Sequence, residues 1–118
     1  MKYDLNQLLK HDSASADPES SELPRPLIQA WGLSRDSKGH LYITDGSDQI
    51  HVVDPHKWRV VNSIKVKNED GSEELSNLNE LEVVSDKWAF ANQYTENELL
   101  QISLESGRVL RRWDLSAL

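Results

Sequence analysis

The sequence has no cysteine among its 118 residues. This absence excludes disulfide frameworks, thiolate nucleophiles and zinc sites that depend on cysteine ligands. No apolar run approaches the length of about 20 residues that a membrane-spanning helix needs, so no membrane partner is expected. The first six residues also lack the apolar core of a secretory signal peptide.

Basic residues are scarce relative to acidic ones. Lysine and arginine together number 13 against 20 aspartates and glutamates, which gives a formal net charge of -7. The sequence contains no basic stripe that could displace counterions from phosphates, so nucleic acid is not an expected partner. The acidic surface is expected to keep the chain in solution, and it would attract a peptide's N-terminal ammonium group only weakly.

Motifs for several common chemistries are missing as well. The sequence has no glycine-rich phosphate loop, no G-x-S-x-G nucleophile elbow and no calcium loop of the EF-hand type. The spacing of the histidines does not match a zinc site, so exposed or edge positions are expected for all of them: His11, His40, His51 and His56. We therefore expect neither a metal site nor a cofactor.

From residue 30 onward, β-branched and aromatic residues alternate with polar ones in short segments separated by turn signals. This pattern is typical of antiparallel β-strands. The predicted strands lie near residues 30–35, 40–45, 49–54, 59–66, 79–84, 87–92, 98–104 and 108–114. The predicted fold class is all-β.

An internal repeat divides these strands into two similar units. Residues 41–45 correspond to residues 88–92, and residues 51–53 correspond to residues 100–102, at an offset of roughly 50 residues. Such a period is typical of β-propeller blades. The sequence therefore predicts two four-stranded antiparallel blades, at about 30–66 and 79–115, joined by an acidic polar connection.

The N-terminal part differs in composition from the rest. Residues 1–10 contain a few apolar side chains, and residues 11–26 are dense in Ser, Asp, Glu and Pro, which is typical of a loop or a disordered segment. We therefore predict two regions. Residues 1–26 would contain a remnant strand and a disordered segment, and residues 27–118 would form a partial propeller.

Polar side chains lie inside two of the predicted strands. Asn79, Glu80 and Glu82 belong to one of them, and Asn92 belongs to the next. A polar group inside an otherwise buried strand needs a hydrogen-bond partner or a function. On a regular strand Glu80 and Glu82 would share one face, and Asn79 would take the other.

Several blocks, in order, resemble the glutamine cyclotransferase family. They are Trp31-Gly32-Leu33, Leu41 to Gly46, Ile50 to Pro55, Asn79 to Glu82, Ala91-Asn92, and Trp113-Asp114-Leu115. In that family they correspond to a GWGL block, an LY-x-SDG strand, a DP turn, an LNELE block, a WAN-x-W-Q-T-D strand and a closing W-x-DL strand. The family folds as a five-bladed β-propeller, so the resemblance implies that this chain is a fragment of one, because only about two blades fit its length.

The resemblance implies a glutaminyl-peptide cyclotransferase, an acyltransferase that needs no metal. In its reaction the amine of an N-terminal glutaminyl residue attacks its own side-chain carboxamide, closes a pyroglutamyl ring and releases ammonia. Because the two groups are already tethered, the site mainly moves protons and stabilises the carbonyl oxygen as negative charge develops. The expected partner is a peptide or protein substrate with an N-terminal glutamine.

The resemblance points to three site residues. Asn79 matches the Asn of the LNELE block, which implies a catalytic contact to the substrate amide or the oxyanion, with the capping of a turn as the alternative. Tyr94 lies where the family has a Trp, and Trp31 begins the GWGL-like block. Both are candidates for substrate binding, with packing in loops or between blades as the alternative. Glu80 and Glu82 are expected to bind backbone amides or a neighbouring blade.

The proton-transferring Glu and the oxyanion Lys of the family have no match here, and Lys65 and Lys67 are poor substitutes. Two alternatives therefore stay open: a non-catalytic propeller module that binds peptide or protein, and a calcium-dependent lactonase-type propeller. A two-blade piece would also expose blade faces and sheet edges, so we expect marginal stability or self-association. Relatives are often exported, but this sequence leaves the compartment open.

Overall fold

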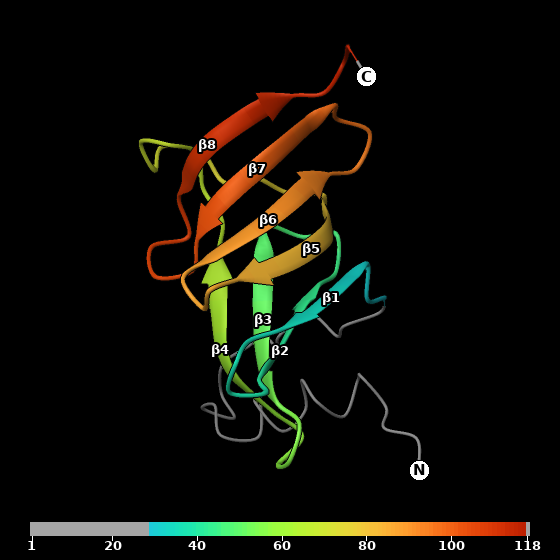
Figure 1. Cartoon of the computed structure of the whole chain (residues 1–118), viewed down its shortest axis with the longest axis vertical. Coiled ribbons are helices and arrows are strands. Elements are labelled where there is room, and N and C mark those ends of the chain that lie inside the picture. Colours follow the sequence, from blue (N-terminus) through green and yellow to red (C-terminus); the bar gives the residue numbers. More distant parts are fainter. Residues whose placement is uncertain (1–28, 118) are drawn as a thin grey trace, which may run out of the picture.

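A computed structural model describes residues 29–117, which form two antiparallel β-sheets. The first sheet contains β1 (Gly32–Arg35), β2 (Leu41–Thr44), β3 (Gln49–Asp54) and β4 (Arg59–Lys65). The second sheet contains β5 (Leu78–Val84), β6 (Trp88–Gln93), β7 (Glu98–Ser103) and β8 (Val109–Asp114). Both sheets are meanders whose strands follow one another in chain order (Figure 1).

These sheets confirm the all-β prediction and the two four-stranded antiparallel units, and each predicted strand overlaps an observed one. The remnant strand and disordered segment predicted for residues 1–26 lie outside the described residues, so this division of the chain stays a prediction. In the described part of the chain, no helix is long and apolar enough to span a membrane.

The two sheets repeat the same register. Ile43 pairs with His51 in the first sheet, and Ala91 pairs with Leu100 in the second. The pairing of β3 with β4 shifts between Val52 and Val53, and that of β7 with β8 shifts between Gln101 and Ile102. Equivalent positions are therefore 48 residues apart in β2 and β6 (43 to 91), one more than in the predicted match of 41–45 to 88–92, and 49 residues apart in β3 and β7 (51 to 100).

The core lies between the two sheets. Side chains alternate between the two sides of each strand, and one side of each sheet contributes to a single buried cluster. This cluster joins Tyr42, Ile50, Val52 and Ile64 of the first sheet to Leu78, Leu81, Ala89, Ala91, Leu100, Ile102 and Val109 of the second. The strand of the second sheet that contacts β1 and β2 is β5 (Figure 1).

Gly32 allows β1 and β5 to approach each other closely. A Cβ atom at position 32 would lie 2.2 Å from the Asn79 carbonyl oxygen and 2.8 Å from Thr44 Oγ1, so only glycine fits. Two side chains of the first sheet hydrogen-bond the β5 backbone at this contact. Thr44 Oγ1 donates to the Asn79 carbonyl, and Ser34 Oγ accepts from the Val83 amide at 2.8 Å.

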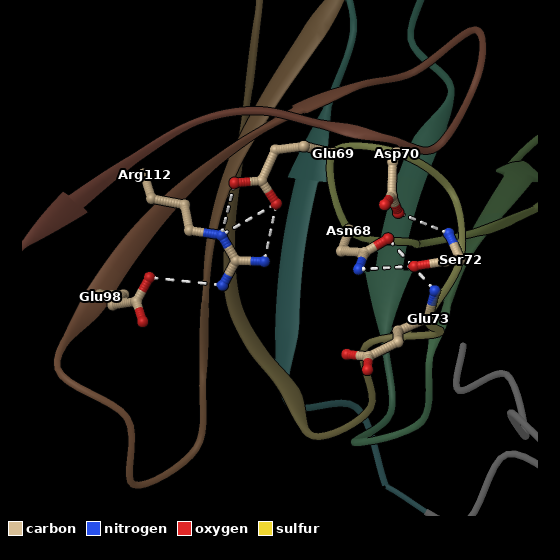
Figure 2. A network of polar contacts seen from close by, with 7 residues as sticks. All are labelled: Asn68, Glu69, Asp70, Ser72, Glu73, Glu98 and Arg112. Carbon is tan, nitrogen blue, oxygen red and sulfur yellow. Dashed lines mark hydrogen bonds and ion pairs between the residues drawn. The ribbon is translucent and has the colours of Figure 1, made fainter.

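The connection between the sheets, residues 66–77, is bound to the outer edge of the second sheet. The Arg112 guanidinium on β8 donates to both carboxylate oxygens of Glu69, at 2.9 to 3.1 Å, and to Glu98 at 3.4 Å (Figure 2). The hydrogen bond with Glu69 raises the pKa of Arg112. The turn inside the connection is held by its own polar groups, which belong to Asn68, Asp70, Ser72 and Glu73.

Candidate functional site

Four segments of the chain meet at one end of the two sheets, which we call the rim. They are Trp31, the β2–β3 turn (residues 45–48), the residues around the start of β5 (76–79) and the β6–β7 turn (residues 94–97). The Gly46 amide donates to the Leu78 carbonyl at 3.2 Å, and the Asn77 amide donates to the Gly46 carbonyl at 2.9 Å. The Tyr94 amide donates to the Asn77 carbonyl at 2.8 Å. These backbone bonds join turns of both sheets to the start of β5.

The rings of Trp31 and Tyr94 contact each other at the rim. Their centroids are 5.6 Å apart with an interplanar angle of 66°, an edge-to-face arrangement that aromatic pairs favour. Trp31 lies against Gly46, where a Cβ atom would be 2.7 Å from the indole ring. Tyr94 is 58% exposed, so much of its ring is free to contact a ligand. Two residues predicted from separate blocks thus form one aromatic wall across the two sheets.

Asn79 lies in a β-bulge at the start of β5. Leu78 pairs with Gln93 and Leu81 pairs with Ala91, so two residues of β5 lie opposite Asn92 alone. The Glu80 amide donates to the Asn92 side-chain oxygen at 3.0 Å. The bulge interrupts the regular alternation between Leu78 and Leu81, whereas Glu80 and Glu82 are both exposed on either side of the buried Leu81.

The Asn79 side chain is half-buried at the start of β5. Its backbone carbonyl accepts the Thr44 hydroxyl, but within residues 29–117 its carboxamide makes no hydrogen bond. It directly follows Leu78, whose carbonyl binds the Gly46 amide beneath Trp31. The structure therefore brings Trp31 and Tyr94 into contact and places Asn79 on the strand that begins at the same rim.

A buried polar chain in the first sheet was not found by sequence reasoning. His51 Nε2 lies 3.2 Å from Asp45 Oδ2, and His51 Nδ1 lies 3.1 Å from Ser63 Oγ. His51 is only 7% exposed because β3 is an interior strand, so the expectation of an exposed or edge position is wrong for this histidine. The signal that would have indicated it is Asp45 in the turn preceding β3, combined with alternation that puts His51 on the same face as Val53.

Hydrogen bonds keep the Asp45 carboxylate in its charged form. Burial alone would raise its pKa, but hydrogen bonds from His51 and from Ser47 outweigh burial and lower the pKa to about 2. The Ser47 amide donates to Asp45 Oδ1 at 3.0 Å. Because Gly46 follows directly and supports Trp31, the Asp45 contacts fix the turn on which the aromatic wall is built.

Two carboxylates lie near Lys65, those of Asp48 in the β2–β3 turn and of Glu74 in the connection between the sheets. Lys65 Nζ lies 3.3 Å from Glu74 Oε1. Burial, followed by a hydrogen bond with Glu74, raises the pKa of Asp48, and the same hydrogen bond, aided by Lys65, lowers the pKa of Glu74. The ammonium group of Lys65 is therefore already paired. Among residues 29–117, no three histidine, aspartate or glutamate side chains are grouped so that they could hold a metal ion.

Comparison with known proteins relates this fold to others. The glutamine cyclotransferase family matches residues 5–118. The crystal structure of Myxococcus xanthus glutaminyl cyclase superposes with a TM-score of 0.68 at 29% identity, over 76% of this chain and 37% of that chain. Kuenenia stuttgartiensis hydrazine synthase superposes with a TM-score of 0.54 at 20% identity, over 75% of this chain and 24% of that chain, which shows a shared fold alone. No curated protein matches the sequence significantly. The chain thus spans little more than a third of the glutaminyl cyclase.

Proposed function

This chain belongs to the glutamine cyclotransferase family, and we propose that its rim forms part of a glutaminyl-peptide cyclotransferase site. That site would convert an N-terminal glutaminyl residue to a pyroglutamyl residue. The observation that carries this proposal is the contact between Trp31 and Tyr94 at the rim where β5 begins, together with an Asn79 carboxamide on that strand that has no hydrogen-bond partner within residues 29–117.

Each of these three side chains suits one requirement of the reaction. The aromatic wall would pack against the methylene groups of the glutaminyl residue and keep water from them. The Asn79 carboxamide would donate a hydrogen bond to the substrate's side-chain carbonyl oxygen, which becomes negative when the amine attacks. A bond forms between the amine nitrogen and the carboxamide carbon, the bond to the amide nitrogen breaks, and the leaving nitrogen takes up a proton as ammonia. We assign this proton transfer to groups that the chain itself does not supply.

Peptide binding tests the assignment of Asn79 even if the chain alone releases no ammonia. We expect a peptide that begins with glutamine to bind the wild type and to bind Asn79→Ala about tenfold more weakly, the loss expected for one hydrogen bond. Asn62→Ala, which removes an exposed carboxamide on β4, is the matched control and should bind like the wild type. Equal affinity of the Asn79→Ala variant and the wild type would refute the assignment.

Ammonia release distinguishes catalysis from binding alone. Incubation with the same peptide, followed by mass spectrometry for the pyroglutamyl product, should show conversion when the missing parts of the site are present. The ion pair of Lys65 with Glu74 favours the second candidate, a non-catalytic module that binds peptide or protein. Such a module would bind peptides whatever their first residue, whereas the proposed site requires glutamine. A chelator titration tests the calcium-dependent alternative, which no contact described above favours.

A further inference from the structure

The β2–β3 turn (residues 45–48) joins the two sheets at the rim. Gly46 exchanges backbone hydrogen bonds with residues 77 and 78, and the Ser47 carbonyl accepts the amide of residue 78 at 3.2 Å. Gly46 has a φ of 83° and lies directly against the indole ring of Trp31. The position of this turn therefore sets where Trp31 lies relative to the start of β5.

The equivalent turn of the second sheet is attached to the start of β5 in a different way. At the offset of 48 residues, Asp45 corresponds to Gln93. The Gln93 side chain donates to the Ser76 carbonyl at 2.9 Å, so it binds the chain that leads into β5. The Asp45 carboxylate is directed instead toward its own sheet, where it pairs with His51. The first turn thus depends on a partner within its own sheet.

The pair of Asp45 and His51 is held on every side. Asp45 Oδ1 accepts the amide and the hydroxyl of Ser47, and Oδ2 lies 3.2 Å from His51 Nε2. The other ring nitrogen, Nδ1, lies 3.1 Å from Ser63 Oγ on β4. A charged carboxylate can only accept a hydrogen bond, so Nε2 carries the proton and Nδ1 of the neutral ring accepts the Ser63 hydroxyl. The imidazole therefore ties the turn to β3 and β4 together.

We propose that His51 is a positioning residue of the rim. Through Asp45 it fixes the β2–β3 turn, and through this turn it sets the position of Trp31 relative to Asn79, without a hydrogen bond of its own to either side chain. Its part in substrate binding rests on the proposed function, whereas its effect on the position of Trp31 does not. A side chain that orients the groups of a site in this way is expected to alter binding without contacting the ligand.

Three variants separate positioning from stability. His51→Leu removes the donor to Asp45, whereas His51→Gln keeps one, because the glutamine amide nitrogen can take the place of Nε2. The double variant His51→Leu, Asp45→Asn removes the pair without leaving a buried charge, so it keeps the test open if His51→Leu does not fold. His56→Leu, at an exposed histidine of the β3–β4 turn, is the matched control.

Nitrogen–proton correlation NMR spectra report the rim directly. The indole signal of Trp31 and the carboxamide signals of Asn79 should shift in the double variant, and they should return to the wild-type positions in His51→Gln. They should not move in His56→Leu. Trp31→Phe and Asn79→Ala assign these signals by their disappearance. A folded double variant whose signals coincide with those of the wild type would overturn the proposal, because the turn would then keep its position without His51.

Peptide affinity tests the part that His51 plays in binding. A peptide that begins with glutamine should bind the double variant about three- to tenfold more weakly than the wild type, the loss that one hydrogen bond corresponds to. His51→Gln should recover most of this affinity. Shifted signals with unchanged affinity would overturn the role of His51 in binding. If the wild type binds no such peptide, the proposed function fails, and the NMR comparison still decides whether His51 positions Trp31.

The wild type provides a test that needs no variant. The nitrogen chemical shifts of the His51 ring should show a neutral imidazole with its proton on Nε2, donated to Asp45. A neutral ring with its proton on Nδ1 would overturn the proposal, because Nε2 could then not donate to the carboxylate.

Discussion

The two sheets have the same strand order and register, yet equivalent positions carry different chemistry. His51 and Ser63 in the first sheet correspond to Leu100 and Arg112 in the second. The first pair belongs to a buried polar chain with Asp45, whereas Leu100 lies in the apolar core. The comparison teaches that the repeat sets the backbone, while the neighbours of each sheet decide which side chains the backbone can hold.

The candidate site depends on both sheets. Trp31 enters from the first sheet, and Asn79 and Tyr94 belong to the second. Thr44 and Asn92, which are equivalent by the repeat, bind neighbouring backbone groups of the same bulge from the two sheets. A change in either sheet is therefore expected to alter the rim.

The largest expected effect is on stability. Truncating a buried side chain of the first sheet should cost much more unfolding free energy than truncating its partly buried equivalent in the second sheet. Ile50→Ala should lower the free energy of unfolding by about 3 to 4 kcal/mol, because the side chain is fully buried between the sheets. Its equivalent, Leu99→Ala, should cost about 1 kcal/mol, because this side chain is only partly buried. Denaturant titrations at one fixed protein concentration would measure both losses. Equal losses of unfolding free energy would show that positions 50 and 99 are equally buried, which would contradict the expected difference.

A smaller loss of stability is expected when His51 is replaced by leucine, the residue at the equivalent position 100 of the second sheet. His51→Leu would leave the Asp45 carboxylate buried without its imidazole partner, at a cost of about 3 kcal/mol. The double variant His51→Leu, Asp45→Asn removes the stranded charge and should recover more than half of that loss. The denaturation midpoint reports the result, and no recovery in the double variant would show that packing rather than charge requires the histidine.

Acid should remove the stabilising contribution of Asp45. Because the folded-state pKa of Asp45 is lowered from 3.8 to about 2, this carboxylate stabilises the fold above pH 4 and loses that contribution as the pH falls toward 2. The contribution at neutral pH is about 2 kcal/mol. Unfolding free energies of the wild type and Asp45→Asn should therefore converge between about pH 4 and pH 2. A constant gap across this range would contradict the prediction.

The smallest expected effect tests the contact between the sheets. Thr44→Val keeps the shape of the buried side chain but removes the hydroxyl that donates to the Asn79 carbonyl. It should cost about 1 to 2 kcal/mol of stability. It should also weaken binding of a glutamine-initiated peptide, because the bulge that holds Asn79 loses one of its supports. Unchanged binding with reduced stability would show that Thr44 stabilises the fold without positioning Asn79.

Some of the site could be predicted from local pattern and family resemblance, and some could not. Asn79, Tyr94 and Trp31 were identified as candidates from their sequence blocks, and their roles in a reaction stay proposals. The bulge formed by Asn79 and Glu80 could not be located from the sequence, because an extra residue in one strand is defined only by its pairing with the other. His51 was misplaced for a similar reason, since its partners Asp45 and Ser63 lie on neighbouring strands and turns.

The sequence by itself determined the all-β class, the strands and the repeat of about 50 residues, because alternation and turn residues act between near neighbours in the chain. Tertiary structure alone decided that Trp31 contacts Tyr94, that His51 is buried and that Trp113 is exposed while its equivalent Ile64 is covered. These outcomes depend on which faces of the sheets pack together. Such contacts join residues that are far apart in sequence, so local sequence patterns do not predict them.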